Sequence, residues 1–222
     1  MTGMTTEAPR FDAMREAMVT SQLRTTAVSD HRVLTAMAQV PREEFVPAAR
    51  REVAYTDRLV PLGRGRVLNT PMATGKLLTE AYLRAEDRVL LIGAASGYAA
   101  ALLAGIVAEV VAVEVDPVLA DQARAALAGT PNVLVVEGPL EAGHPAGTPY
   151  DVLVIDGAIG ELPRALIEQV AIGGRVVAGV IDRGVTRLAS GVRSSHGFGL
   201  THFADAECAP LPGFARARSF QF

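Results

Sequence analysis

The fold is decided by the stretch Arg88-Val-Leu-Leu-Ile-Gly-Ala-Ala-Ser-Gly-Tyr98 and by the acid Glu114 that follows it. An apolar run, a Gly-x-x-x-Gly turn, a helical pattern and a second apolar run closed by an acid are typical of a nucleotide-type ligand site. Gly93 and Gly97 let the backbone approach a ligand, and the helix that follows offers free N–H groups. Glu114 can accept hydrogen bonds from ribose hydroxyls. Spacing alone does not distinguish a dinucleotide from S-adenosylmethionine.

The same region contains an apolar run without a charged residue, from Val89 to Ala108. Its length alone would suffice to span a bilayer. Three glycines and Ser96 interrupt it, however, and divide it into a β-rich piece and an Ala-rich piece. Because buried parallel strands are apolar on both faces, we interpret the run as strand, turn and helix. We see no secretory signal at the start of the sequence.

Composition indicates one large α/β domain rather than a specialised class. The chain has 222 residues, of which 50% are hydrophobic and 20% charged, enough for a full core. A net charge of -3 and 5% aromatic residues give no reason to expect nucleic acid as a partner. The single Cys208 excludes an internal disulfide and fits a reducing, cytoplasmic compartment. The four histidines show no ligand-like spacing, so we expect no metal site.

Strand-like and helical patterns alternate regularly after the first apolar run. The expected strands are Val89–Ile92, Val110–Glu114, Val133–Val136, Val152–Ile155 and Arg175–Val180. The expected helices are Tyr98–Val107, Val118–Ala128 and Leu162–Ala171. Such alternation predicts an α/β fold with a doubly wound, mostly parallel sheet. Val185–Val192 and Leu200–Ala209 have no helix between them, which predicts an antiparallel hairpin at one edge of the sheet.

The first seventy residues follow a different pattern and predict a helical and loop segment, 1–70, packed on an α/β domain, 71–222. Phe11–Arg24 has a helical rhythm, and a second helix begins at the cap Ser29-Asp30 and ends before Pro41. Residues 54–69 are expected to form a loop or a short hairpin, and Pro71 can open a helix through Leu83. At the other end, 220–222 is a candidate last strand or packed tail.

Several motifs outside the glycine turn are specific for one family. They are Met18-Val-x-x-Gln22-Leu, Val40-Pro-Arg-Glu-x-Phe45-Val-Pro47, Leu62-Gly63-x-Gly65 leading to Pro71, and Pro163-x-x-Leu166-x-x-Gln169 before Gly173-Gly174. Over Met18 to Val180 the chain resembles the protein-L-isoaspartate O-methyltransferases, as a divergent member. The resemblance implies the S-adenosylmethionine-dependent methyltransferase fold and a cytoplasmic repair enzyme. Its substrates would be isoaspartyl-containing peptides or proteins, whose carboxylate attacks the methyl group, with no membrane partner.

The resemblance also assigns expected site residues. The family's Gly-Gln-Thr-Ile-Ser loop corresponds to Gly65-Arg-Val-Leu-Asn69, so Asn69 takes the place of the serine that holds the substrate carboxylate. We therefore expect Asn69 as the catalytic residue. The expected cofactor-binding residues are Gly93, Ser96, Gly97, Glu114 and Gly138.

Other positions depart from the family pattern: Leu91 replaces an acid before the turn, Ala95 the middle glycine of the turn, and Pro139 an aspartate after Gly138. These departures support two alternatives, a catalytically degenerate homologue that acts as a binding or regulatory module, and a methyltransferase with another small-molecule substrate. Further candidates are Arg64 and Arg66 as a carboxylate clamp, Asp156 at the ligand edge of the sheet, and Asp116 as a helix cap. The spacing does not indicate the oligomeric state.

Overall fold

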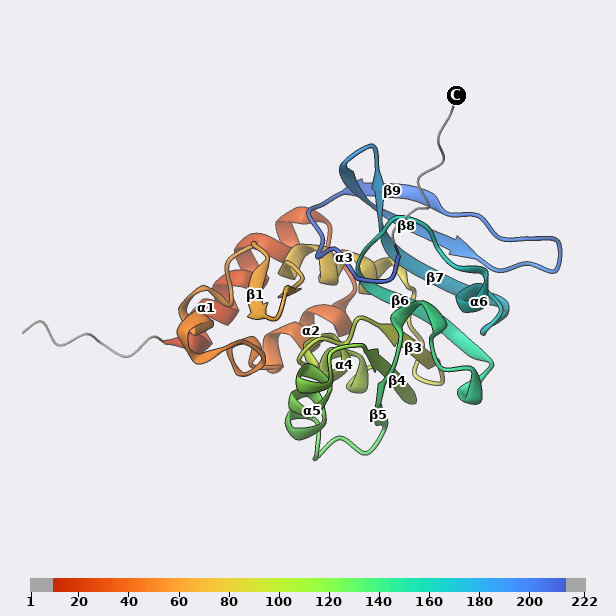
Figure 1. Cartoon of the computed structure of the whole chain (residues 1–222). Helices are drawn as coiled ribbons and strands as arrows, with labels where there is room; N and C mark the ends of the chain where they lie inside the picture. The colour runs from red at the N-terminus through yellow and green to blue at the C-terminus, as the bar shows by residue number, and fades with distance from the viewer. Residues whose placement is uncertain (1–9, 215–222) are drawn as a thin grey trace, which may run out of the picture.

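A seven-stranded sheet forms the centre of the computed structural model, which describes residues 10–214 (Figure 1). The strand order is β5-β4-β3-β6-β7-β8-β9, parallel from β5 to β7 and antiparallel from β7 to β9. The strands are β3 (Arg88–Ile92), β4 (Glu109–Glu114), β5 (Val133–Glu137), β6 (Tyr150–Ile159), β7 (Val170–Asp182), β8 (Val185–Val192) and β9 (Thr201–Asp205). The predicted α/β class, with an antiparallel hairpin at the C-terminal edge, is confirmed.

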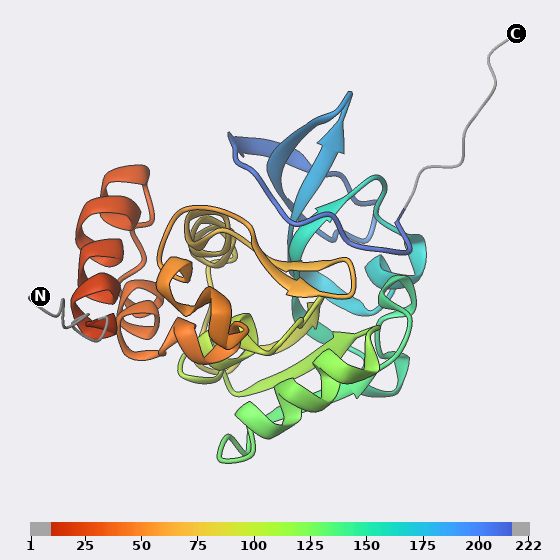
Figure 2. The ribbon, with the colours of Figure 1, turned by 60° about the vertical axis from the view of Figure 1, so that its left-hand side comes forward.

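Helices cover the sheet, and a small hairpin lies beside it. The α-helices are α1 (Phe11–Ala17), α2 (His31–Gln39), α3 (Pro71–Glu80), α4 (Tyr98–Ala104), α5 (Pro117–Ala126) and α6 (Arg164–Ile167). The chain of α1 continues as a π-helical turn, Met18–Leu23, and a 3-10 turn, Arg24–Thr26. The hairpin consists of β1 (Val60–Gly63) and β2 (Arg66–Leu68). Figure 2 shows the N-terminal helices on one side of the molecule and α5 lying across the sheet.

Local sequence signals explain where several helices begin. Asp116 is the N-cap of α5 and accepts hydrogen bonds from the backbone N–H groups of Val118 and Leu119, as the sequence predicts. Asp30 caps α2, and Thr70 caps α3 ahead of Pro71. These side chains satisfy N–H groups that the first helical turn leaves unpaired.

The strands of the sheet bury both faces. On β3, Val89 and Leu91 belong to one core cluster, and Leu90 and Ile92 belong to a second cluster on the other face. This period of two follows from the alternation of side chains along a strand. The first cluster also contains apolar residues of the N-terminal segment, among them Met18, Leu23 and Met37. The described part of this segment therefore packs on the same core as the sheet.

Several expected helices are shorter than their patterns suggest; α4, for example, ends at Ala104 and not at Val107. Two other cases show the reason. The pattern Leu162–Ala171 forms a helix only over Arg164–Ile167, because Val170 already pairs with Tyr150 as the first residue of β7. The helix expected to reach Leu83 ends at Glu80. In both cases tertiary pairing or a turn overrides helical propensity. Within residues 10–214, none of the helices is long and apolar enough to cross a membrane. The candidate strand 220–222 lies outside the described residues.

Candidate functional site

The carboxyl ends of β3 and β6 meet at the point where the chain changes direction in the sheet. From β3 the chain proceeds to β4 and β5 on one side, whereas β6 and β7 lie on the other side. Ile92 and Ile155 are register partners, so Gly93 and Asp156 follow at neighbouring strand ends. In open α/β sheets, ligands bind in the crevice at this kind of switch point.

The turn after β3 has the backbone conformation that its glycines predict. Gly93 and Gly97 have φ values of 83° and 101°, and Gly97 is the N-cap residue of α4. Ala95 also has a positive φ, 49°, where the related enzymes are expected to have glycine. A left-handed conformation costs a residue with a Cβ roughly 1–2 kcal/mol. The chain therefore retains the turn geometry despite the substitution.

Glu114 lies beneath this turn at the end of β4 and is completely buried. Its carboxylate accepts hydrogen bonds from Arg66 Nε at 3.2 Å and Arg66 Nη2 at 2.8 Å. It also accepts from the backbone N–H of Ala95 at 2.7 Å and from the two residues that follow it, both at 3.0 Å. Arg64 makes a parallel contact, with its Nε 2.5 Å from Asp116 Oδ2. The candidate clamp arginines thus pair with acids of the chain itself.

Of the two other expected cofactor residues, Ser96 lies within the turn and Gly138 follows β5. Ser96 is buried, and its hydroxyl donates to the backbone carbonyl of Phe45 at 2.5 Å, which ties the turn to the N-terminal segment. Gly138 follows β5, and its N–H donates to the backbone carbonyl of Glu114 at 3.0 Å. A Cβ at Gly138 would meet open space.

Asn69 belongs to a buried polar network at the same strand ends. Its Nδ2 donates to Asp156 Oδ1 at 2.9 Å, and Thr74 Oγ1 donates to the same oxygen at 2.8 Å. Asn69 Oδ1 accepts from the backbone N–H of Ala209 at 3.0 Å. Arg42 Nη2 donates to the Asn69 carbonyl at 2.5 Å. Asn69 is 2% exposed, and its side chain is also a hydrogen-bond partner of the Cys208 thiol, so residues of the chain itself surround the amide.

Arg42 anchors this network from the N-terminal segment. It is fully buried, and its Nε donates to the carbonyl of Ala54 at 2.7 Å. Its guanidinium lies 4.7 Å from the centre of the Tyr98 ring, a cation–π contact. Burial lowers the pKa of Arg42, although the charge of Asp156 counteracts this effect. The sequence marked Arg42 as a family motif residue but gave no sign of its partners.

The C-terminal segment 209–214, which carries no recognised motif, also contributes to the site. Ala158 N donates to the carbonyl of Ala209 at 2.7 Å, and Leu211 N donates to the carbonyl of Ala158 at 2.9 Å. The side chain of Leu211 covers Gly93 and Gly157, since a Cβ at either glycine would lie within 3 Å of it. The segment is therefore held against the switch point.

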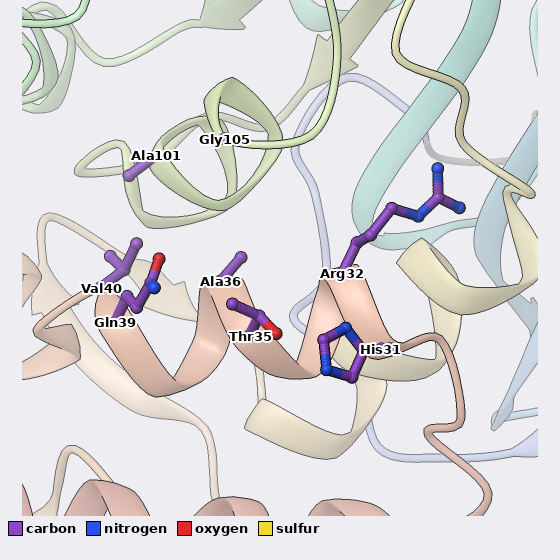
Figure 3. Close-up of a pocket in the computed structure, with 8 residues that line it drawn as sticks. All are labelled: His31, Arg32, Thr35, Ala36, Gln39, Val40, Ala101 and Gly105. Carbon is purple, nitrogen blue, oxygen red and sulfur yellow. The ribbon is translucent and has the colours of Figure 1, made fainter.

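A cavity of about 510 Å³ opens between three segments at this edge: residues 64–66 of the hairpin, residues 115–117 after β4, and residues 210–212. This volume lies in the range of small-molecule sites. A cavity of about 200 Å³ lies between α2 and α4, where Ala36 and Val40 point toward α4 (Figure 3). It reaches Gly105, at the end of α4 opposite the glycine turn. The larger cavity begins directly after Glu114, at Val115 and Asp116, although none of the five expected cofactor residues is among the described residues that line it.

The environment of Asp156 predicts a pH-dependent contribution to stability. Burial raises its pKa above the ordinary 3.8, against the opposing effects of Asn69, Thr74 and Arg42. The folded chain therefore holds this proton more tightly than the unfolded chain, and the stabilisation is lost as pH rises from 3.8 through the folded pKa. We expect the stability of the wild type relative to Asp156→Asn to fall as pH rises above the ordinary pKa of 3.8. Urea titrations measure this difference, and a constant value would contradict the prediction.

A doubly wound sheet with a glycine turn after its central strand and a buried acid at the end of the next strand is the architecture of a nucleotide-type site. The sequence profile of the family described as "Protein-L-isoaspartate(D-aspartate) O-methyltransferase (PCMT)" matches residues 13–199. This family match distinguishes the two cofactor classes and makes the chain an S-adenosylmethionine-dependent methyltransferase. The chain belongs to this family, and the resemblance predicted from its motifs is confirmed.

Individual relatives agree with this assignment. The chain is 42% identical over 211 residues to protein-L-isoaspartate O-methyltransferase 1 of Rhodopseudomonas palustris, covering 93% of this chain and 86% of the relative. It is 45% identical over 171 residues to the enzyme of Methanoculleus marisnigri, covering 76% and 78%. A solved structure of a putative family member from Plasmodium falciparum, in complex with S-adenosyl-L-homocysteine, has the same fold. Its TM-score is 0.74 at 16% identity, covering 89% of this chain and 96% of that one.

Proposed function

We propose that this chain transfers a methyl group from S-adenosylmethionine to the free carboxylate of L-isoaspartyl residues in peptides or proteins, with release of S-adenosylhomocysteine. The observation that carries the proposal is the position of Asn69. It stands where the family is expected to have its carboxylate-holding serine, and its amide is hydrogen-bonded to Asp156, the residue of β6 directly after the segment that pairs with β3. Asp156 directly neighbours Gly93, because the preceding residues of the two strands are register partners. The proposed acceptor-holding group and the cofactor turn thus share one crevice.

The residues proposed to hold the cofactor are Gly93, Ser96, Gly97, Glu114 and Gly138. The positive φ values of the turn glycines, the open space at Gly138 and the size of the adjacent cavity support this assignment. When bound, S-adenosylmethionine supplies an activated methyl group. Glu114 would accept hydrogen bonds from its ribose hydroxyls, and the glycine turn would contact its methionine part.

The remaining task of the chain is to orient the acceptor, since a carboxylate is already ionised at neutral pH and needs no general base. One amide hydrogen of Asn69 would turn from its partner in the free chain to one carboxylate oxygen of the substrate, which leaves the other oxygen to attack the methyl group. Arg42, which binds the Asn69 carbonyl, and Ala209, which binds its Oδ1, fix the direction of this donor. The rate enhancement would then come from the fixed orientation of the acceptor, which can lower the activation free energy by several kcal/mol.

Substitution of Asn69 tests the proposal. Asn69→Ala should lower turnover of an isoaspartyl peptide by about 10- to 100-fold, the effect of losing one hydrogen bond to a charged group. The affinity for S-adenosylhomocysteine should remain within about 3-fold, because Asn69 lies outside the cofactor residues. Asn69→Ser should retain or raise turnover, since a hydroxyl restores the family's donor. Transfer of a labelled methyl group and calorimetry measure the two quantities.

Asn132→Ala provides a matched control. Asn132 Nδ2 also donates to backbone carbonyls, those of Ala104 and Val107, but at the other end of the sheet. Its loss should affect stability without changing turnover. Wild-type protein that binds S-adenosylhomocysteine but methylates no isoaspartyl peptide, with no recovery in Asn69→Ser, would instead favour the degenerate homologue or a changed substrate.

The same hypothesis implies the partners of the protein and its compartment. The proposed partners are isoaspartyl-containing peptides or proteins, and the proposed compartment is the cytoplasm, supported by the buried free thiol of Cys208. We further infer that residues 1–70 act with the main domain 71–222 as one unit. The hydrogen bonds from Arg42 to Asn69 and from Ser96 to Phe45 support this inference.

A further inference from the structure

The carboxylate of Glu114 has no acceptor position left for a ligand. Arg66 donates to it through two nitrogens, and the backbone N–H groups of Ala95, Val115 and Asp116 supply three more hydrogen bonds. Two carboxylate oxygens offer about four lone-pair sites, so five donors already use all of them. A ribose diol can bind this carboxylate only after one donor leaves.

Arg66 is the donor that can leave. The three backbone N–H groups belong to the glycine turn and to the residues directly after Glu114, so the chain itself fixes them. Arg66 comes from a two-stranded hairpin whose tip, residues 63–65, is exposed. A two-stranded hairpin has little stability by itself. In addition, Arg66 Nη1 is buried without a hydrogen-bond partner in the described chain, which lowers the cost of releasing the guanidinium to water.

Arg66 also lies on the path from the cavity to the acid. It is 5% exposed and lines the cavity of about 510 Å³ together with Arg64 and Asp116. Glu114 is 0% exposed and is absent from the described residues that line this cavity. The pair between Arg64 and Asp116, at 2.5 Å, holds the same hairpin at the surface against the second residue after β4. The hairpin therefore covers Glu114 in the free chain.

We propose that Arg66 competes internally with the cofactor ribose for the carboxylate of Glu114. Arg66 thereby sets the affinity of the site for nucleoside ligands that carry a vicinal diol. The inference rests on the proposed function, since it requires ribose at Glu114. On binding, the two ribose hydroxyls replace the two N–H donors of Arg66, and the guanidinium moves to solvent. The measured affinity is then the intrinsic affinity reduced by the fraction of molecules in which Arg66 has left Glu114.

Calorimetric titration with S-adenosylhomocysteine tests the proposal. Arg66→Met and Arg66→Gln should both bind about 10-fold or more tightly than the wild type, because the competing charged donor is gone. Arg64→Met is the matched control on the same hairpin. Its pair with Asp116 holds the same hairpin, but Arg64 does not contact Glu114, so its affinity should rise by less than about 5-fold. Arg164→Met, which removes an exposed arginine of α6 outside the described lining of the cavity, should leave the affinity unchanged. Equal or weaker binding by both Arg66 variants would overturn the proposal.

A double-mutant cycle separates competition from general loosening of the hairpin. In a Glu114→Gln background, the gain from Arg66→Met should fall below about 3-fold, because the charged target of the arginine has been removed. An undiminished gain would overturn the role of Glu114. Absence of binding by the wild type and every variant would overturn the proposed cofactor site and this inference together, a pattern distinct from binding that Arg66 does not weaken.

A measurement on the wild type does not depend on the folding of any variant. The Nε–H of Arg66 is buried in the pair with Glu114, so its nuclear magnetic resonance signal should be protected from solvent exchange in the free protein. Arg66→Gln assigns the signal by its loss. Saturating S-adenosylhomocysteine should remove the protection, since the guanidinium is then in water. A signal that stays protected in the complex would contradict displacement.

Discussion

Replacing Arg42 with methionine should lower the free energy of unfolding by about 3–5 kcal/mol, the cost of breaking a fully buried charged contact. The change removes the donors to the carbonyls of Ala54 and Asn69 and leaves both oxygens buried. It also removes the positive charge that lowers the pKa of Asp156. Urea unfolding followed by circular dichroism measures the effect.

Two further variants test whether the loss of stability comes from the buried contacts of Arg42. Arg42→Lys keeps a charge but not the planar fork that reaches two carbonyls, so it should recover only part of the loss. Arg164→Met removes an exposed arginine paired with Glu168 within α6, and should change stability by less than about 1 kcal/mol. A loss in Arg42→Met no larger than in Arg164→Met would show that the buried network contributes little to stability.

Gly157→Ala should displace the C-terminal segment and lower turnover by about 100-fold, the order expected when reacting groups are misplaced by 1 Å. A Cβ at this position would lie 2.6 Å from Leu211 Cγ and 2.7 Å from the carbonyl of Ala209. That carbonyl is bound to Ala158, so the backbone cannot yield without breaking a hydrogen bond. Asn69 then loses its partner at Ala209. We expect a stability loss of about 1–3 kcal/mol from overpacking.

Gly129→Ala is the corresponding control, because a Cβ there meets open space after α5. It should leave turnover unchanged and shift stability by less than about 0.5 kcal/mol. Methyl transfer and thermal unfolding of the two variants can be compared directly. Normal turnover in Gly157→Ala would mean that residues 209–214 take no part in positioning the site.

The sequence by itself determined the parts of this protein that depend on neighbouring residues. The succession of β3, glycine turn, α4 and β4 was predicted because apolar period, turn chemistry and strand-end acids are local signals. The cap at Asp116 and the antiparallel pair of β8 and β9 have the same origin. The motifs that gave the family are also short segments. Local prediction was wrong for the length of α6, where strand pairing with β6 prevailed over helical pattern.

Only the tertiary structure decided which polar groups meet. Arg66 and Glu114 are 48 positions apart, Asn69 and Asp156 are 87 apart, and Asn69 and Ala209 are 140 apart. Each residue had a local interpretation as a loop arginine, a strand-end acid or a turn amide. Buried polar groups must be paired, but the partner depends on how the hairpin, the sheet and the C-terminal segment pack in space. For this reason the sequence predicted which strand ends carry the candidate site, whereas the packing decided that Arg66 pairs with Glu114 and that Asn69 lies between Arg42 and Asp156.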